Sequence, residues 1–147
     1  MNVAMAVHPL KKAAIKPSSS THRGMLSPKE FKIVDATLQS LRGAGGIELQ
    51  WEWKGKDTGW VCAAKYSGQT LCEVHAANNP IRGVLPLSEN LLIKLRSAKA
   101  FPKGFKTFLD HPSNTKKGYC FYEMEIETTE LRDLLSHLVG AILQHVE

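Results

Sequence analysis

Four short segments within residues 46–87 alternate apolar and polar side chains, and this alternation constrains the fold more than any other feature of the chain. Alternate residues of a strand share one face of a sheet, and so do directly opposed residues of paired strands. A four-residue turn at 55–58 would oppose apolar residues only, and therefore predicts a first hairpin with one buried face. The predicted pairs are Trp53–Trp60, Trp51–Cys62, Leu49–Ala64 and Ile47–Tyr66.

The next hairpin distinguishes two strand registers. A two-residue turn at 67–68 would place Cys62 opposite Glu73 and mix the core with charge. A three-residue turn at 67–69 places Cys62 opposite Val74 instead. Because a slip of one residue exchanges the two faces of a strand, the apolar pattern favours the three-residue turn. The same register sets Ala64 opposite Cys72, and the turn that follows sets Val74 opposite Gly83.

Capping signals and helical periodicity predict the elements around these four strands. Residues 27–30, Ser-Pro-Lys-Glu, form a capping box with proline at the first helical position. Ser88 caps a second helix, Thr128 or Thr129 caps the last helix, and residues 119–126 form a fifth strand. We therefore expect an α+β domain in the order α-β-β-β-β-α-β-α: a mainly antiparallel sheet of about five strands with three helices packed on one face.

The N-terminal stretch has the composition of a disordered segment. Residues 1–29 carry five basic and no acidic side chains, and Pro9 and Pro17 interrupt any apolar periodicity. We expect residues 1–26 to be a disordered basic tail, residues 27–147 to form a single α+β domain, and no residue before Ser27 to be buried.

The cysteine pattern argues for buried thiols. Cys62, Cys72 and Cys120 all occupy apolar strand positions, and no CxxC spacing supports a zinc site. Free thiols are typical of a reducing compartment. No apolar run approaches the roughly 18 residues of a membrane span. We expect a cytoplasmic protein with no metal, no cofactor and no membrane partner.

Aromatic side chains on the apolar face are the candidate ligand site. If the helices cover this face incompletely, the rings would line a small-molecule pocket, and if the cover is complete they are core residues. The candidates are Trp51, Trp53, Trp60 and Tyr66.

Two further groups of polar residues are candidates. On the opposite face, Glu52, Glu73 and His75 could converge as a carboxylate–histidine site, although solvated sheet faces commonly carry such residues. The stretch 99–118 fits no single predicted element and is the most basic part of the domain, as expected of a loop that contacts nucleic acid. Its candidate lysines are Lys99, Lys103, Lys106, Lys116 and Lys117.

One stretch carries a family resemblance. The run Lys-Asp-Thr-Gly-Trp at 56–60, then Lys65 and Leu-Cys-Glu-Val at 71–74, resembles a family of small bacterial domains of unknown function. In that family a Gly-Trp strand leads to a Leu-Cys strand. The resemblance implies a bacterial, cytoplasmic, single-domain α+β protein, and it assigns no catalytic residue.

No catalytic or metal-ligand motif is present in the sequence. We therefore expect non-enzymatic binding of a small molecule or of a protein partner, with a homodimer left open. Two alternatives also stay open, namely single-stranded nucleic-acid binding through the basic loop and an enzyme whose site the sequence does not reveal.

Overall fold

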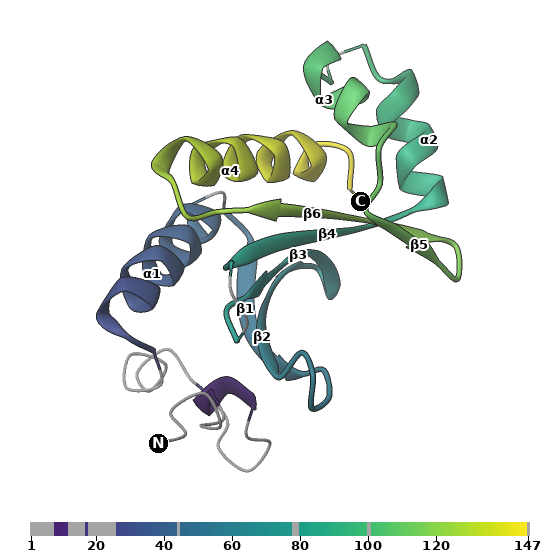
Figure 1. Ribbon diagram of the computed structural model, residues 1–147. Helices are drawn as coiled ribbons and strands as arrows, with labels where there is room; N and C mark the ends of the chain where they lie inside the picture. The colour runs from purple at the N-terminus through teal and green to yellow at the C-terminus, as the bar shows by residue number, and fades with distance from the viewer. Residues whose placement is uncertain are drawn as a thin grey trace.

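The computed structural model describes residues 8–11, 17, 26–43, 45–77, 80–99 and 101–146. They form one antiparallel sheet of six strands with four α-helices and a short 3₁₀ turn, so the predicted α+β class is confirmed (Figure 1). The elements are η2 (Pro9–Lys11), α1 (Pro28–Arg42), β1 (Ile47–Trp53), β2 (Trp60–Tyr66), β3 (Gln69–His75), β4 (Arg82–Ser88), α2 (Glu89–Ser97), α3 (Lys103–Leu109), β5 (Asn114–Lys116), β6 (Tyr119–Glu125) and α4 (Thr129–Leu143).

The sheet has the strand order β1-β2-β3-β4-β6-β5 and is strongly curved (Figure 1). Helices α1 and α4 contact each other over its apolar face, where the hydroxyls of Ser40 and Ser136 lie 2.6 Å apart. We call α2 and α3 together, residues 89–110, the basic arm. The arm projects from the end of the sheet that carries β5 (Figure 1). This layout leaves α4 with one side against the sheet and another toward solvent.

The first hairpin pairs as predicted. Trp53 lies opposite Trp60, Trp51 opposite Cys62, and the pairing continues in step to Ile47. The amide of Lys54 also donates to the carbonyl of Gly59 at 2.9 Å, which leaves a four-residue turn. The apolar pattern predicted this register correctly, because a slip of one residue in either direction would have opposed Trp60 to a charged side chain.

The second hairpin has the predicted pairs but not the predicted turn. Cys62 lies opposite Val74 and Ala64 opposite Cys72, as expected. However, the turn is the two-residue one, because Tyr66 pairs with Gln69. A β-bulge after Ala64 then shifts the register by one residue, so that the apolar faces meet again.

The extra residue of the bulge is Leu71, which has no partner in the ladder and is fully buried. Ser67 (φ 50°) and Gly68 (φ 80°) both have the left-handed conformation that a tight two-residue hairpin needs. The prediction of a three-residue turn is therefore wrong. The reason is that the core accepts Leu71 as an inserted residue, and the predicted apolar pairs resume beyond it.

Residues 99–118 contain two elements that the sequence did not assign. Pro102 precedes α3, where its fixed φ is compatible with a helix start, and Gly104 lies in the first turn. Strand β5 consists of three exposed residues paired with β6. The Tyr122 hydroxyl donates to the carbonyl of Leu109 at 2.7 Å and thereby ties α3 to the sheet.

The predicted helix caps are confirmed. The Ser27 hydroxyl accepts from the amide of Glu30 at 3.2 Å, and the Glu30 carboxylate accepts from the amide of Ser27 at 2.9 Å. Ser88 and Thr128 cap α2 and α4 through their hydroxyls. Each cap satisfies helix N–H groups that otherwise have no partner within the helix.

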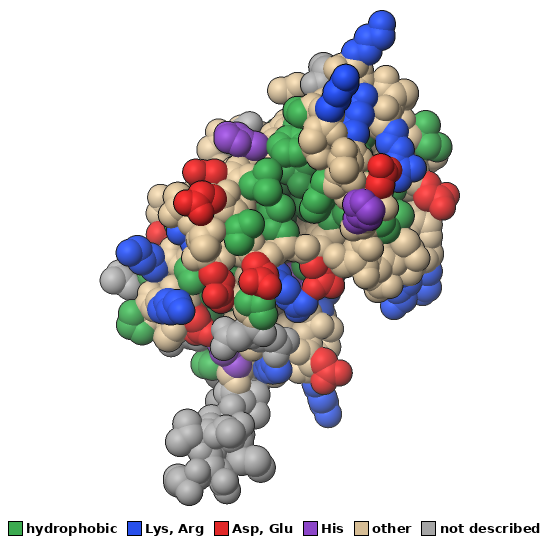
Figure 2. All heavy atoms as spheres, turned by 45° about the horizontal axis from the view of Figure 1, so that its top comes forward, with side chains coloured by type: hydrophobic (Ala, Val, Ile, Leu, Met, Phe, Trp, Pro, Cys, Tyr) green, Lys and Arg blue, Asp and Glu red, His purple; other side chains and the backbone are tan. Residues whose placement is uncertain are grey.

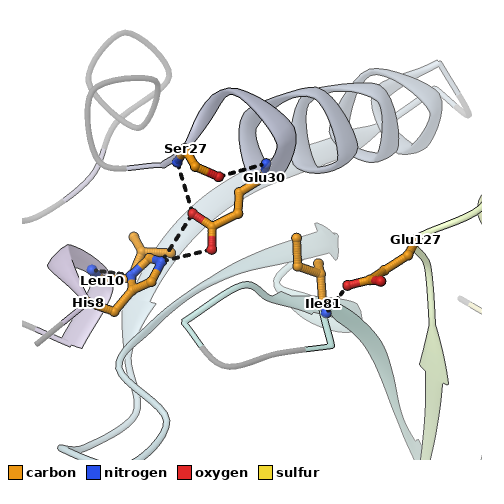
Figure 3. A network of polar contacts seen from close by, with 6 residues as sticks. All are labelled: His8, Leu10, Ser27, Glu30, Ile81 and Glu127. Carbon is orange, nitrogen blue, oxygen red and sulfur yellow. Dashed lines mark hydrogen bonds and ion pairs between the residues drawn. The ribbon is translucent and has the colours of Figure 1, made fainter. Parts of the chain in front are cut away.

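Most of the predicted tail, residues 1–26, lies outside the described residues, but its described part packs against the domain. His8 accepts from the Leu10 amide through Nδ1 at 3.0 Å, so in the neutral ring Nε2 donates to the Glu30 carboxylate at 3.3 Å (Figure 3). Leu10 is fully buried, and a Cβ atom on Gly59 would lie 2.3 Å from the Leu10 carbonyl oxygen. The expectation that nothing before Ser27 is buried is therefore wrong.

The two sheet faces differ less than the sequence suggested. The face toward α1 and α4 holds the main core, including Trp51, Cys62 and Cys72. On the outer face, Val61 and Ala63 are also fully buried. Among the described residues, no helix is long and apolar enough to cross a membrane.

Candidate functional site

The aromatic candidates lie in or against the core. Trp51 and Trp60 are buried, with 8% and 9% of their surface exposed, and Trp53 meets Trp60 edge-on with ring centroids 5.6 Å apart. Tyr66 is half-buried beside Gly46. This packing is what a core requires of large rings. Ligand binding by these four residues stays a prediction, and the grooves described below are lined by other side chains.

The polar candidates of the outer face lie close together, and lysine side chains form ion pairs with both carboxylates. Lys54 lies 3.3 Å from both Glu52 and Glu73, Lys65 lies 2.6 Å from Glu52, and His75 lies 3.0 Å from Glu73. We call these five residues the charged network. Among the described residues, no group of three or more histidine, cysteine, aspartate or glutamate side chains could hold a metal ion.

The carboxylates of the charged network are held in the ionised state. The hydrogen bond from Lys65 lowers the pKa of Glu52 and outweighs its partial burial. Burial alone would raise the pKa of Glu73, but the hydrogen bond from His75 and the charge of Lys54 lower it overall. A carboxyl with a lowered pKa is a poor general acid at neutral pH. The network therefore has the properties of a structural ion-pair cluster.

This cluster predicts an acid-sensitive contribution to stability. A carboxylate whose folded-state pKa lies below the ordinary 4.5 stabilises the fold above that pH, and the contribution is lost as the pH falls through the folded-state value. We expect the urea midpoint of the wild type to fall more steeply between about pH 5 and pH 3 than that of Glu52→Gln/Glu73→Gln. Tryptophan fluorescence measures both midpoints, and parallel pH profiles would contradict the assignment.

The five candidate lysines divide between two elements. Lys99, Lys103 and Lys106 belong to the basic arm, and Lys116 and Lys117 to the β5–β6 hairpin. Both elements lie at one end of the molecule, because the amide of Glu89 donates to the carbonyl of Gly118 at 3.1 Å. Basic side chains gather over the arm in Figure 2.

The largest groove described crosses α4, and sequence reasoning missed it. The groove is open to solvent, has a volume of about 880 Å³, and is bounded by the end of α1 and the start of α3. We call it the α4 groove. Its lining residues are Ser40, Gly43, Pro102, Phe105, Asp133, Ser136, His137, Gly140, Ala141, Leu143 and Gln144.

The lining of the α4 groove includes several small residues, among them Gly140. A Cβ atom added to Gly140 would meet no atom within 4 Å, whereas one added to Gly83 would lie 2.7 Å from Leu135. Gly83 thus lets α4 approach the sheet, but no contact within the described part of the fold requires Gly140. A glycine in the middle of a predicted helix was the only sequence signal for this surface.

Comparisons with protein-family models, with curated proteins and with solved structures found no match. The resemblance to small bacterial domains of unknown function therefore gains no support from them and stays an expectation.

Proposed function

We propose that this protein is a non-enzymatic binding module whose α4 groove accepts an amphipathic helix of a partner protein. The observation that carries the proposal is an open groove along the solvent side of a surface helix, with empty space above Gly140. Helix-in-groove docking is a recurrent mode of peptide recognition.

The shape of the groove favours an elongated partner over a small molecule. Sites for small ligands enclose most of the ligand surface, but this groove is open along α4. Its lining runs from Asp133 to Gln144, about three helical turns or roughly 16 Å at ~1.5 Å per residue. A partner helix of similar length would match this floor.

The chemistry of the lining fits a protein interface. Phe105, Ala141 and Leu143 supply apolar contacts, while Ser40 and His137 stand among the polar lining residues. An apolar centre with a polar rim is the usual anatomy of protein interfaces. Hydrophobic side chains also gather in the middle of the face shown in Figure 2, and Leu134 of α4 is 39% exposed.

Gly140 supports close approach of a partner. Glycine inside a helix is less favourable than alanine by ~1 kcal/mol, and here the space above it is empty. Its absence of a side chain lets a second backbone lie close to α4. The proposal thus accounts for a glycine at this position despite its lower helix propensity.

A graded series at Gly140 tests the proposal. Helical 16-residue peptides selected by display against the wild type should share apolar residues at i, i+3, i+4 and i+7. We expect Gly140→Trp, whose side chain fills the groove, to weaken these peptides at least tenfold in fluorescence anisotropy. Gly140→Ala is the matched control, because it adds one methyl group and should retain binding while raising stability by ~1 kcal/mol.

Two outcomes would overturn this function. The first is a set of selected peptides without helical periodicity. The second is a peptide affinity that stays unchanged in Gly140→Trp, with circular dichroism showing that the variant is folded. Either result would place the binding surface elsewhere on the molecule.

A further inference from the structure

We propose that the outer face of the β5–β6 hairpin binds single-stranded nucleic acid, with an unpaired base stacked on Tyr119 and phosphates contacted by Lys116 and Lys117. This surface is separate from the α4 groove and does not depend on the function proposed for it. It rests on a pair of aromatic rings, of which Tyr119 is exposed and Phe121 half-buried, on the lysines beside them and on the charge of this end of the molecule.

The aromatic pair consists of Tyr119 and Phe121. Their rings have centroids 6.3 Å apart and are tilted by 33°. Tyr119 is 46% exposed, one of three large apolar side chains in the described part of the chain that are largely open to solvent. Both rings alternate along β6 with Tyr122, which is fully buried, so they lie on the outer face.

The lysines are placed beside these rings by the hairpin. Lys116 lies directly opposite Tyr119 in the β5–β6 ladder and therefore shares its face. Lys117 and Gly118 form the turn, with φ angles of 50° and 80°. The left-handed conformation is unfavourable for a lysine and suits asparagine or glycine better. This turn nevertheless presents a positive charge at its tip.

The surrounding charge favours a polyanion. Residues 89–118 carry seven basic and two acidic side chains, and so they account for as much net charge as the whole chain, +5. The nearest acidic residue along the outer face of β6 is Glu123, which is ion-paired with Arg82. Glu125 follows it, further from the hairpin turn. Along β6, phosphates can thus approach from the turn without meeting an unpaired carboxylate before Glu125, while the exposed Glu89 lies beside the turn, with its amide bonded to the Gly118 carbonyl.

The aromatic pair selects single strands over other polyanions. Unpaired bases stack on aromatic rings, whereas the bases of a duplex are stacked on each other and leave only phosphates for contact. A polycation without ring contacts would bind single strands and duplexes through charge alone. The decisive quantity is therefore the affinity for single-stranded nucleic acid relative to that for a duplex.

The test measures fluorescence anisotropy of a labelled 12-nucleotide oligo-dT and of a 12-base-pair duplex with the full chain, between about 50 and 200 mM salt. We expect the single strand to bind more tightly than the duplex at every salt concentration. Tyr119→Ala should weaken single-strand binding by roughly 5- to 150-fold without changing its salt dependence. Tyr119→Phe, which keeps the ring, should retain the wild-type affinity.

Replacing the two lysines should change the salt dependence of single-strand binding. Lys116→Gln/Lys117→Gln should lower the slope of log K against log salt by about 1.4, the value expected for two phosphate contacts on a single strand. Replacing Lys11, Lys12, Lys16 and Arg23 by glutamine in the full chain controls for the basic N-terminal stretch. That control should leave the effect of Tyr119→Ala unchanged.

Three results would overturn the inference. Equal binding of duplex and single strand, or an unchanged affinity in Tyr119→Ala, would reduce the surface to a nonspecific polycation. The third is tighter binding to vesicles of phosphatidylserine and phosphatidylcholine than to oligo-dT, lost in Ile93→Ala. Because Ile93 is 67% exposed on the basic arm, that result would identify an anionic membrane as the partner.

Discussion

Trp51→Ala should lower the free energy of unfolding by ~3–5 kcal/mol, as expected for a buried large side chain replaced by alanine. Trp51 is 8% exposed, belongs to the core and lies opposite Cys62. The loss is a large part of the ~5–15 kcal/mol that ordinary domains possess. For a chain of this length it corresponds to a fall in melting temperature of roughly 6–20 °C, measurable by calorimetry.

The neighbouring Glu52→Ala is the matched control. Glu52 points to the outer face, where it is ion-paired with Lys54 and Lys65. Ion pairs that remain partly solvated contribute little, so we expect a loss of at most ~1 kcal/mol. Large and equal losses at both positions would mean that the outer face, where Val61 and Ala63 are already buried, is a second core.

Leu10→Ala should also be strongly destabilising, by ~2–5 kcal/mol, because Leu10 is fully buried although it lies in the predicted tail. Its backbone rests on Gly59, where no side chain would fit. Urea unfolding followed by tryptophan fluorescence measures the loss.

Lys11→Ala is the control for this prediction. Lys11 lies in the same 3₁₀ turn but is only half-buried. Its replacement should change stability by about half a kcal/mol or less. If Leu10→Ala proves equally neutral, the packing of residues 8–11 against the domain contributes nothing to stability.

The sheet register could be predicted because the alternation of apolar residues within each strand determines which pairs of strand positions can share the buried face. One slip would have exposed a tryptophan or buried a glutamate, so the pairs around Cys62 followed from the pattern alone. The bulge at Leu71 could not be predicted, since a longer turn and an inserted residue give the same pairing. Only the space available in the core decides between them.

Other elements depend on their neighbours and leave little trace in the sequence. Strand β5 has three exposed residues and no alternation, and it pairs with β6 after a tight turn at Lys117 and Gly118. Leu10 is fully buried, and its backbone lies against Gly59, 49 positions along the chain. Residues 1–26 have a composition typical of disorder, and this composition concealed the burial of Leu10.

The face that carries the aromatic residues was predictable from the sequence, but the α4 groove was not. The sequence identified the aromatic face correctly, and the structure shows Trp51 and Trp60 within the core. The α4 groove requires the relative placement of α1, α3 and α4, which no local pattern encodes. Tyr119 and Phe121 could have been recognised from the parity of β6, because they alternate with Tyr122, which is buried.

The chemical reactivity of the buried cysteines can report on local opening of the sheet. Burial raises the pKa of both Cys62 and Cys72 to about 12. Such thiols are almost entirely un-ionised at neutral pH, and the thiolate is the form that alkylating reagents attack. Labelling of either sulfur therefore waits for the strands around it to separate. The rate of alkylation, followed by mass spectrometry, thus measures how often the central sheet opens, without any introduced probe.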